Sequence, residues 1–392
     1  MTPIPPPAGG EPWLLTPGPL TTAHSVKAAM LRDWGSWDAD FRAMTAAMRT
    51  RLVALLGDPS FTCVPIQGSG SFVVEAMLGT LIPRGGRALV LANGAYGQRA
   101  AAALRTMGRA VAVLDKGDFA PPRGAEVAQA LAADPGITHV VAIHCETSSG
   151  ILNPLEEIAE AVAVAGRRLL VDAMSSFGAV PIDPARIPFD ALVSSANKCI
   201  EGVPGFGFIL ARTDILAASA GNAHSLSLDA HAQWAEMERS GQWRYTPPTH
   251  VVAAFLEALR LHAAEGGITG RGARYAANRD MLVSGMRALG FRTLLPDRWL
   301  SPIITTFFAP ADPAFDFARF YEAMKARGFI IYPGKLTRVD SFRLGHIGQM
   351  DVAVMRAVLQ AVEESIAEMG VQSCAPAREM LAGQLEPEGE TQ

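Results

Sequence analysis

The sequence has little excess charge of either sign and no long apolar run. Its 392 residues include 34 Lys and Arg against 38 Asp and Glu, a formal net charge of −4 at pH 7. Without a basic excess, neither nucleic acid nor an anionic membrane surface is an expected partner. Residues 1–10 lack the basic and apolar regions of a signal peptide, and no run is long enough to cross a bilayer. The expected location is therefore the cytoplasm.

Cysteine and histidine are also scarce. The four cysteines, at positions 63, 145, 199 and 374, do not have the spacing of a metal site or a disulfide framework. We expect them to be reduced and to behave as small buried hydrophobic residues. The eight histidines contain no His-Glu-x-x-His pattern. This disfavours a metal hydrolase, and we predict no metal site.

Apolar residues are abundant, at 49% of the chain against 18% charged residues, which is typical of a soluble globular protein with a large core. Short apolar runs at residues 88–92, 110–114, 139–144, 169–172 and 191–194 have helical patterns between them at 98–107, 124–133 and 155–165. This alternation predicts an α/β fold with a mostly parallel sheet covered on both faces. The run 206–211 follows a connection too short for a crossover helix, so we expect it to be antiparallel.

The flanking segments suggest how the chain is divided. Helices are predicted at residues 26–56, 72–82 and 251–263, and the glycines between 266 and 270 predict a domain boundary near 270. A smaller α+β unit should follow, with helices at 274–289, 315–327 and 352–369 and strands near 303–308, 329–331 and 342–344. The predicted parts are a flexible lead (1–13), a large domain (14–270), a small domain (271–372) and an acidic disordered tail (373–392).

Several side chains with useful chemistry follow the predicted strands. Lys198 comes after the run 189–195, at the edge where open α/β sheets bind ligands, and its amine could form a Schiff base with a carbonyl cofactor such as pyridoxal 5′-phosphate (PLP). The simpler alternative is a solvated surface lysine. Tyr96, Thr147 and Asp172 follow other strands, and their simpler alternatives are a packed aromatic, a turn hydroxyl and a helix cap. Parallel strands would bring all four to one edge.

Two further features are suited to binding anions. The turn Ser69-Gly70-Ser71 opens a predicted helix, so its amides and hydroxyls could hold a phosphate; the alternative is an ordinary capping turn. Arg343 lies among apolar residues and glycines, where its guanidinium could hold a carboxylate or phosphonate in a bidentate manner. The alternative for Arg343 is a structural salt bridge.

Taken together, these stretches resemble the fold-type I, class-V aminotransferases, and among them the enzymes that act on 2-aminoethylphosphonate and pyruvate. The resemblance covers residues 14–369. It rests on Leu15-Thr-Pro-Gly-Pro19, Gln67-Gly-Ser-Gly-Ser71, Asn93-Gly-Ala-Tyr-Gly97, Cys145-Glu-Thr-Ser-Ser-Gly150, Val171-Asp-Ala-Met-Ser-Ser-Phe-Gly178, residues 194–207 and Phe342-Arg-Leu-Gly-His-Ile-Gly348.

The resemblance implies a PLP site. Lys198 would be the Schiff-base lysine, and Asp172 would pair with the pyridine nitrogen and keep it protonated. Tyr96 would stack on the cofactor ring, and Thr147 would lie near its phenolic oxygen. The phosphate would bind to Ser69, Gly70 and Ser71, where Ser71 replaces the family's usual threonine but keeps the hydroxyl.

The resemblance also implies how substrates and subunits are arranged. Arg343 would bind the anionic group of either substrate, with Gly18 nearby. Thr246 would reach the phosphate in the neighbouring subunit of a homodimer with shared active sites.

The implied reaction is transamination of 2-aminoethylphosphonate with pyruvate, giving phosphonoacetaldehyde and L-alanine. Within the family, the alternative is a serine or alanine aminotransferase that uses glyoxylate or pyruvate. A desulfurase or lyase is a more distant alternative. Its only support is Cys374, near the tail, as a cysteine that could carry a persulfide. A non-catalytic PLP-binding regulator would carry a basic helical DNA-binding module, which this sequence lacks.

Overall fold

The computed structural model describes residue 7, residues 10–334 and residues 339–384. The predicted lead (1–13) and tail (373–392) therefore lie partly outside the described residues. In the described part, the tail segment forms a 3-10 helix, η3 (Arg378–Gln384), and Cys374 is buried, which differs from the disorder predicted there. No helix of the described residues is both long and apolar enough to cross a membrane.

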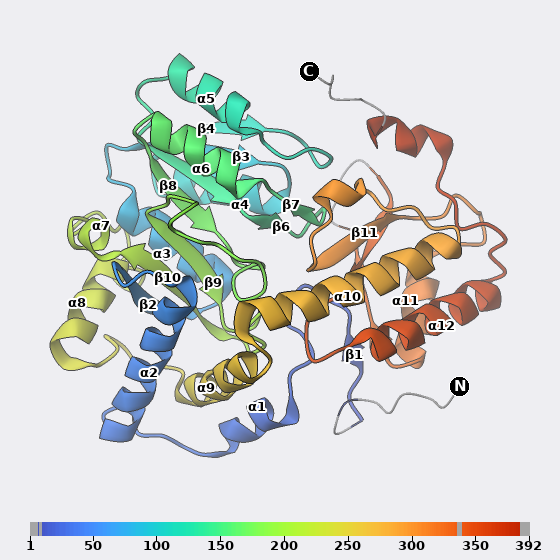
Figure 1. Cartoon of the computed structure of the whole chain (residues 1–392), viewed down its shortest axis with the longest axis horizontal. Coiled ribbons are helices and arrows are strands. Elements are labelled where there is room, and N and C mark those ends of the chain that lie inside the picture. Colours follow the sequence, from blue (N-terminus) through green and yellow to red (C-terminus); the bar gives the residue numbers. More distant parts are fainter. Residues whose placement is uncertain (1–6, 8–9, 335–338, 385–392) are drawn as a thin grey trace.

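A seven-stranded sheet forms the centre of the fold (Figure 1). Its strands, in spatial order, are β2 (Phe61–Gly68), β10 (Gly205–Arg212), β9 (Ala191–Ser195), β8 (Arg168–Asp172), β5 (His139–Ile143), β3 (Arg87–Ala92) and β4 (Ala110–Asp115). Only β10 runs against its neighbours, as its short connection predicted. The mostly parallel α/β sheet is thus confirmed. Sequence analysis missed β2, which contains Pro65; proline is tolerated there because β2 is an edge strand.

Helices cover both faces of this sheet, because successive buried strand residues point to opposite sides. On β9, Leu192 joins a core with helices on one face and Val193 a core with helices on the other. The first face is covered by α2 (Ala39–Leu56), α5 (Gly124–Ala133), α6 (Leu155–Val164) and α9 (Thr249–Ala264). The second is covered by α3 (Gly70–Leu81), α4 (Ala95–Thr106), α7 (Thr213–Ala217) and α8 (Ala230–Ser240).

The helix predicted over residues 26–56 is divided in the structure. The described elements are α1 (His24–Ala28), the 3-10 turn η1 (Ala29–Leu31) and, after a loop, α2. The side chain of Asp38 accepts a hydrogen bond from Asp40 N and starts α2, so a cap inside the apolar pattern sets the division. The predicted stop is confirmed, since α2 ends at Gly57 in the left-handed conformation, with φ of 78°.

The C-terminal part forms a second core around a small antiparallel sheet, with strands in the order β11 (Ile304–Phe308), β14 (Ser341–Gly345) and β13 (Tyr332–Pro333). Helices α11 (Phe317–Ala326) and α12 (Val352–Met369) pack on this sheet. The 3-10 turn η2 (Asp297–Trp299) precedes β11 in the sequence. The N-terminal strand β1 (Trp13–Leu14) pairs with β12 (Phe329–Ile330), and Leu15 is buried in this core. The start of the chain therefore packs against its C-terminal part.

The long helix α10 (Gly267–Ala288) connects the two parts of the chain, and Figure 1 shows it running from the sheet toward β11 and α12. It begins seven residues before the helix predicted from 274. Gly266 is its N-cap, with φ of 99°. The glycines that predicted a boundary near 270 therefore lie at the start of a continuous helix, and the division at 270 stays a prediction.

Candidate active site

A cavity of about 430 Å³ lies at the carboxyl edge of the central sheet. It is lined by residues that follow strands distant in sequence, as expected when parallel strands end together. The predicted site residues that line it are Gly18, Ser69, Gly70, Ser71, Tyr96, Asp172 and Lys198. The lining of this cavity does not include Thr147, Thr246 or Arg343.

Lys198 is half-buried in the loop after β9, which does not fit a solvated surface lysine. Its Nζ donates hydrogen bonds to the carbonyl oxygens of Pro17, at 2.9 Å, and Gly18, at 3.4 Å. A Cβ at Gly18 would lie 2.8 Å from Lys198 Nζ, and Gly18 has φ of +115°, so glycine is required there both sterically and conformationally. The N-terminal loop thus holds the amine at the cavity wall.

Asp172 is the last residue of β8 and is 6% exposed. Burial raises the pKa of its carboxyl to about 6, although the hydrogen bond from Met174 N, at 2.9 Å, and the charge of Lys198 oppose the shift. A buried carboxylate of this kind is suited to pair with a cationic N–H group.

The turn Ser69-Gly70-Ser71 lies at the N-terminus of α3. Ser69 is the N-cap residue, but its side chain makes no capping hydrogen bond. A Cβ at Gly70 would lie 2.8 Å from the sulfur of Met174, so the backbone there lies close against its neighbour. The Ser69 hydroxyl and the positive end of α3 are therefore presented to the cavity rather than used in an ordinary cap, which favours anion binding.

Tyr96 lies in the first turn of α4, and Arg99 follows one turn later on the same helix. The Arg99 guanidinium carbon is 5.0 Å from the centre of the Tyr96 ring, and its Nη1 lies 3.4 Å from Ser71 Oγ. Arg99 lines the cavity and has no carboxylate within salt-bridge distance among the described residues. Sequence analysis missed Arg99. Its spacing of three residues from Tyr96 within a helix is the signal that could have identified it.

Arg343 and Thr147 contact each other beside the cavity. Arg343 lies on β14, is 1% exposed and donates from Nη1 to Thr147 O, at 2.8 Å, and from Nε to Pro333 O, at 3.0 Å. Burial lowers the pKa of Arg343, an effect that the nearby Tyr96, Tyr332 and Glu146 oppose. Within the described ranges it has no carboxylate partner, so the predicted alternative of a structural salt bridge is not observed.

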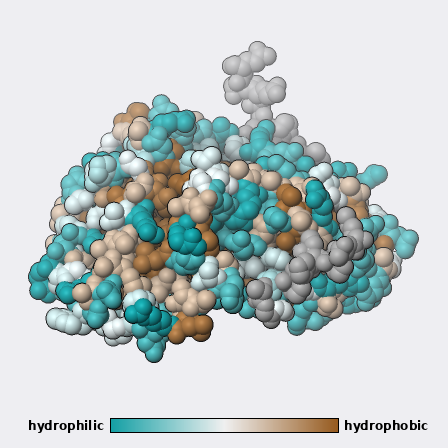
Figure 2. Space-filling model, turned by 60° about the horizontal axis from the view of Figure 1, so that its bottom comes forward, coloured by the Kyte–Doolittle hydropathy of each residue, from teal (hydrophilic) through white to brown (hydrophobic). Residues whose placement is uncertain are grey.

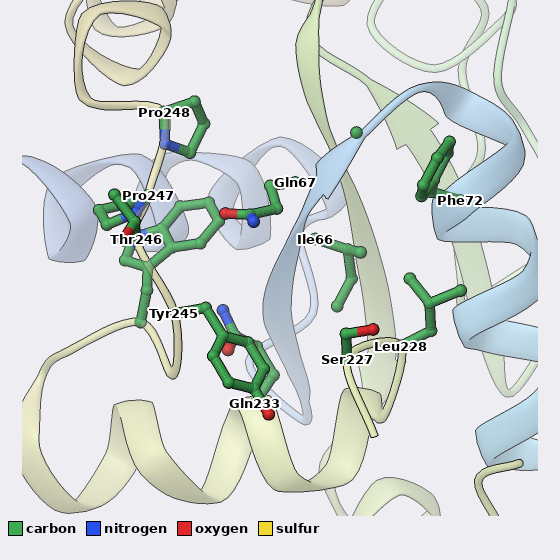
Figure 3. Close-up of a pocket in the computed structure, with 12 residues that line it drawn as sticks. Ile66, Gln67, Phe72, Ser227, Leu228, Gln233, Tyr245, Thr246, Pro247 and Pro248 are labelled. Carbon is green, nitrogen blue, oxygen red and sulfur yellow. The ribbon is translucent and has the colours of Figure 1, made fainter. Parts of the chain in front are cut away.

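Thr246 lines a different feature, a groove of about 540 Å³ that shares Gly68 with the cavity. Figure 3 shows residues 245–248 on one side of the groove and Phe72, from the start of α3, on the other, with β2 between them. Thr246 is therefore close to the cavity but separate from it in a single chain.

The cysteines have the surroundings expected from the sequence. All four are free and buried, and burial raises the pKa values of the Cys63 and Cys145 thiols to about 12 and that of Cys374 to about 11. A thiol with such a pKa is a poor nucleophile near neutral pH, which argues against a persulfide role for Cys374. The described residues contain no group of three or more side chains placed to hold a metal ion.

Comparison with known proteins identifies the family. The sequence model of the "Aminotransferase class-V" family matches residues 24–326. The chain belongs to the class-V aminotransferases. It is 68% identical to the 2-aminoethylphosphonate–pyruvate transaminase of Rhizobium meliloti (strain 1021), over 95% of this chain and 98% of the relative. It is 65% identical to 2-aminoethylphosphonate–pyruvate transaminase 1 of Paraburkholderia xenovorans (strain LB400), over 94% of this chain and 96% of the relative.

Solved aminotransferase structures share the fold. A pyridoxamine–pyruvate aminotransferase from Mesorhizobium loti has a TM-score of 0.84 at 24% identity and covers 93% of this chain and 94% of its own. An aspartate aminotransferase from Thermus thermophilus has a TM-score of 0.81 at 25% identity and covers 91% of this chain and 99% of its own. The prediction of a fold-type I aminotransferase is confirmed.

The cofactor of this class-V aminotransferase is PLP, and the cavity residues fit it. A lysine amine, a buried carboxylate with raised pKa and an uncapped helix N-terminus face one cavity. These groups match an aldehyde, a pyridine nitrogen and a phosphate, the three polar parts of PLP.

Proposed function

We propose that this aminotransferase transfers the amino group of 2-aminoethylphosphonate to pyruvate, forming phosphonoacetaldehyde and L-alanine. The relatives that are 68% and 65% identical carry the name of this activity. The structural observation that carries the proposal is Arg343, a buried guanidinium with no carboxylate partner among the described residues. Such a cation requires an anion, and both substrates are anionic.

The proposed cofactor contacts follow from the cavity. Lys198 would hold PLP covalently through Nζ, and the Asp172 carboxylate would accept a hydrogen bond from the ring nitrogen. Ser69, Gly70 and Ser71 would bind the phosphate. The Tyr96 ring would pack on the pyridine face, and Thr147 would lie toward the phenolic oxygen. Arg99 is added to this set, because its guanidinium lies beside Ser71, where a phosphate oxygen would be accessible to it.

When bound, PLP supplies an aldehyde that condenses with amines and a ring that withdraws electrons from the bond being broken. The rest of the chemistry belongs to the protein. Lys198 Nζ accepts the proton that the amino-bearing carbon of the substrate loses, since it is the amine at the cavity wall. An ionised Asp172 keeps the ring nitrogen protonated, which sustains the electron withdrawal. Burial of both groups strengthens these interactions.

Arg343 would hold the phosphonate of the amino donor in one half-reaction and the carboxylate of pyruvate in the other. A guanidinium can bind either group because both offer two oxygens to its planar set of N–H donors. Its own side chain is fixed by the carbonyl oxygens of Thr147 and Pro333. A fixed cation anchors the anionic end of each substrate at one place beside the cavity.

We also propose that the enzyme is a homodimer in which Thr246 contacts the phosphate bound in the other subunit. The groove that contains Thr246 adjoins the cavity at Gly68. Around it, apolar side chains are exposed on the single chain, including Phe72, Tyr245 and Leu226. Figure 2 shows apolar surface concentrated on the sheet-containing half of the molecule. A second copy would cover this surface.

The cytoplasm is proposed as the location of the enzyme, because all four cysteines are free.

The experiment that tests the function offers the PLP-loaded enzyme a panel of amines with pyruvate. Alanine formation and the loss of the 2-aminoethylphosphonate phosphorus signal are measured together. We expect alanine and phosphonoacetaldehyde in equal amounts. Activity with serine, or between alanine and glyoxylate, and none with 2-aminoethylphosphonate would overturn the proposal in favour of the related amino-acid transaminases.

A further inference from the structure

Glu146 is a fully buried carboxylate beside the cavity, and the reaction described above does not use it. It ends the short strand β6 (Cys145–Glu146), which pairs with β7 (Ile151–Leu152), and its exposed fraction is 0%. Among the described residues it has no lysine or arginine within salt-bridge distance. A buried carboxylate without a cation needs another source of compensation.

Four hydrogen-bond donors provide this compensation. Glu146 Oε1 accepts from Ser148 N, at 3.1 Å, and Ser148 Oγ, at 2.5 Å, while Oε2 accepts from Tyr96 N, at 3.0 Å, and Gly97 N, at 3.3 Å. Ala95 N donates to Ser148 Oγ, which directs the hydroxyl proton to Glu146. Burial raises the pKa of Glu146, and these donors oppose the shift. Four donors satisfy an ionised carboxylate, which only accepts hydrogen bonds.

The donors place Glu146 at the N-terminus of α4. Amides of residues 95–97 are unpaired within a helix that starts at Ala95, and the helix dipole is positive there, so Glu146 acts as a cap contributed by a distant strand. The approach is very close. A Cβ at Gly94 would lie 2.6 Å from Glu146 Cδ, and Gly94 has φ of 158°. The carboxylate therefore fixes the backbone of Tyr96 to β6.

We propose that Glu146 is a positioning residue that holds the Tyr96 ring against the cofactor by anchoring the first turn of α4. This rests on the proposed PLP site, because the role of Tyr96 depends on it. Glu146 itself does not line the cavity. Its effect passes through the backbone amides of Tyr96 and Gly97, whose position sets where the aromatic ring can lie.

Glu146→Gln is a sharp probe, because it keeps the size of the side chain and replaces an acceptor-only carboxylate by an uncharged amide. A glutamine has one acceptor oxygen and one NH₂ group. Whichever way the amide turns, its NH₂ group faces either the donors of Ser148 or the amides of Tyr96 and Gly97. An N–H group of the glutamine would then face another hydrogen-bond donor with no acceptor between them. The first turn of α4 would therefore move away from β6.

The test measures PLP affinity and the visible circular dichroism of the bound cofactor, neither of which requires turnover. Glu146→Gln should weaken PLP binding about 10-fold and change the dichroism. The matched control is Glu160→Gln, an exposed glutamate on α6, which should behave as wild type. Because neither readout depends on the amino donor, a wrong choice of substrate would leave the result unchanged.

A double-mutant cycle with Tyr96→Ala tests the route of the effect. This variant removes the ring but keeps the backbone amide that Glu146 binds. In the Tyr96→Ala background, Glu146→Gln should change PLP affinity less than about twofold. An undiminished 10-fold loss in that background, or wild-type affinity and dichroism in the single variant, would overturn the proposal. If Glu146→Gln does not fold, Ser148→Ala replaces it, with the same expected direction and the same contradicting outcomes.

Discussion

Gly18 and Lys198 are 180 residues apart in the sequence and lie in direct contact. A Cβ on Gly18 would stand 2.8 Å from Lys198 Nζ, and the carbonyl oxygens of Pro17 and Gly18 accept hydrogen bonds from this amine. The N-terminal segment therefore forms part of the cavity wall. The position of Lys198 depends on a glycine about 180 residues earlier.

Gly18→Ala should displace the Lys198 amine and lower kcat about 10- to 100-fold, because a misplaced catalytic group loses its alignment with the substrate. The positive φ of Gly18 adds backbone strain. Steady-state kinetics and thermal unfolding are measured together. Gly35→Ala is the control, since that glycine is exposed and the nearest atom to its Cβ would be 3.7 Å away. Equal kcat values in the two variants would contradict the contact's importance.

Arg343→Ala should raise KM for both 2-aminoethylphosphonate and pyruvate by about 10-fold or more, since one or two charge-assisted hydrogen bonds are lost to each substrate. Arg343→Lys should recover only part of this, because an ammonium does not reproduce the planar arrangement of donors. Separate measurement of the two half-reactions checks the effect. A variant that is impaired with only one of the two substrates would refute a shared anion site.

Asp172 gives a prediction about pH and stability in the cofactor-free protein. Its folded-state pKa, about 6, lies above the ordinary value of 3.8. The folded protein therefore binds this proton more tightly than the unfolded chain, and the carboxyl's contribution to stability is lost as the pH rises through about 6. Asp172→Asn removes the ionisation. It should make the cofactor-free protein about 2–3 kcal/mol more stable than wild type at pH 7.5.

Urea unfolding at pH 7.5 and at pH 4 checks this, and the advantage of Asp172→Asn should largely disappear at the lower pH. The same variant should lose aminotransferase activity, because an amide cannot keep the ring nitrogen protonated. A cofactor-free Asp172→Asn protein that is less stable than wild type at pH 7.5 would contradict the assigned burial cost.

Tyr275 on α10 connects the loop after Lys198 to the loop after Arg343. Its hydroxyl donates to Glu201 Oε1, at 2.6 Å, and accepts from Gly348 N, at 3.3 Å. Tyr275→Phe should cost about 1–3 kcal/mol in unfolding free energy, because a buried carboxylate and a buried amide each lose a partner. Tyr321→Phe on α11 is the control, with a half-buried ring. Similar losses of stability in the two variants would argue against this link.

Subunit complementation tests the shared active site. Lys198→Ala and Thr246→Glu should each be inactive when purified alone. Mixed dimers formed by dissociation and reassociation should regain activity, because one of the two sites then combines an intact Lys198 with an intact Thr246 from the other chain. If Thr246 instead serves the site of its own chain, no mixed dimer holds an intact site and activity stays absent.

The fold was largely predictable from the sequence, because the parallel strands are short continuous apolar runs such as residues 139–144 and 191–194. The antiparallel direction of β10 followed from the length of one connection. Tertiary context decided the rest. Pro65 concealed the strand β2, whose position at the sheet edge permits a proline. Asp38 caps a second helix inside the segment that the apolar spacing had predicted to be one helix.

The site was only partly predictable. Strand-end residues such as Lys198 and Asp172 were found because topology alone brings them to one edge. Arg99 was missed, because its importance depends on the position of Tyr96 one helical turn earlier. Glu146 was missed because two of its four donors come from α4, which is about 50 residues away in the sequence and meets Glu146 only in the folded chain.

The most direct test of this account locates the covalent bond to the cofactor. The PLP-loaded protein is reduced with borohydride, digested and analysed by peptide mass spectrometry. The account predicts the reduced cofactor on the peptide containing Lys198, and neither this adduct nor the visible absorbance of the lysine-bound cofactor in Lys198→Ala. Label on another lysine, such as Lys116, or the same absorbance in Lys198→Ala, would contradict it.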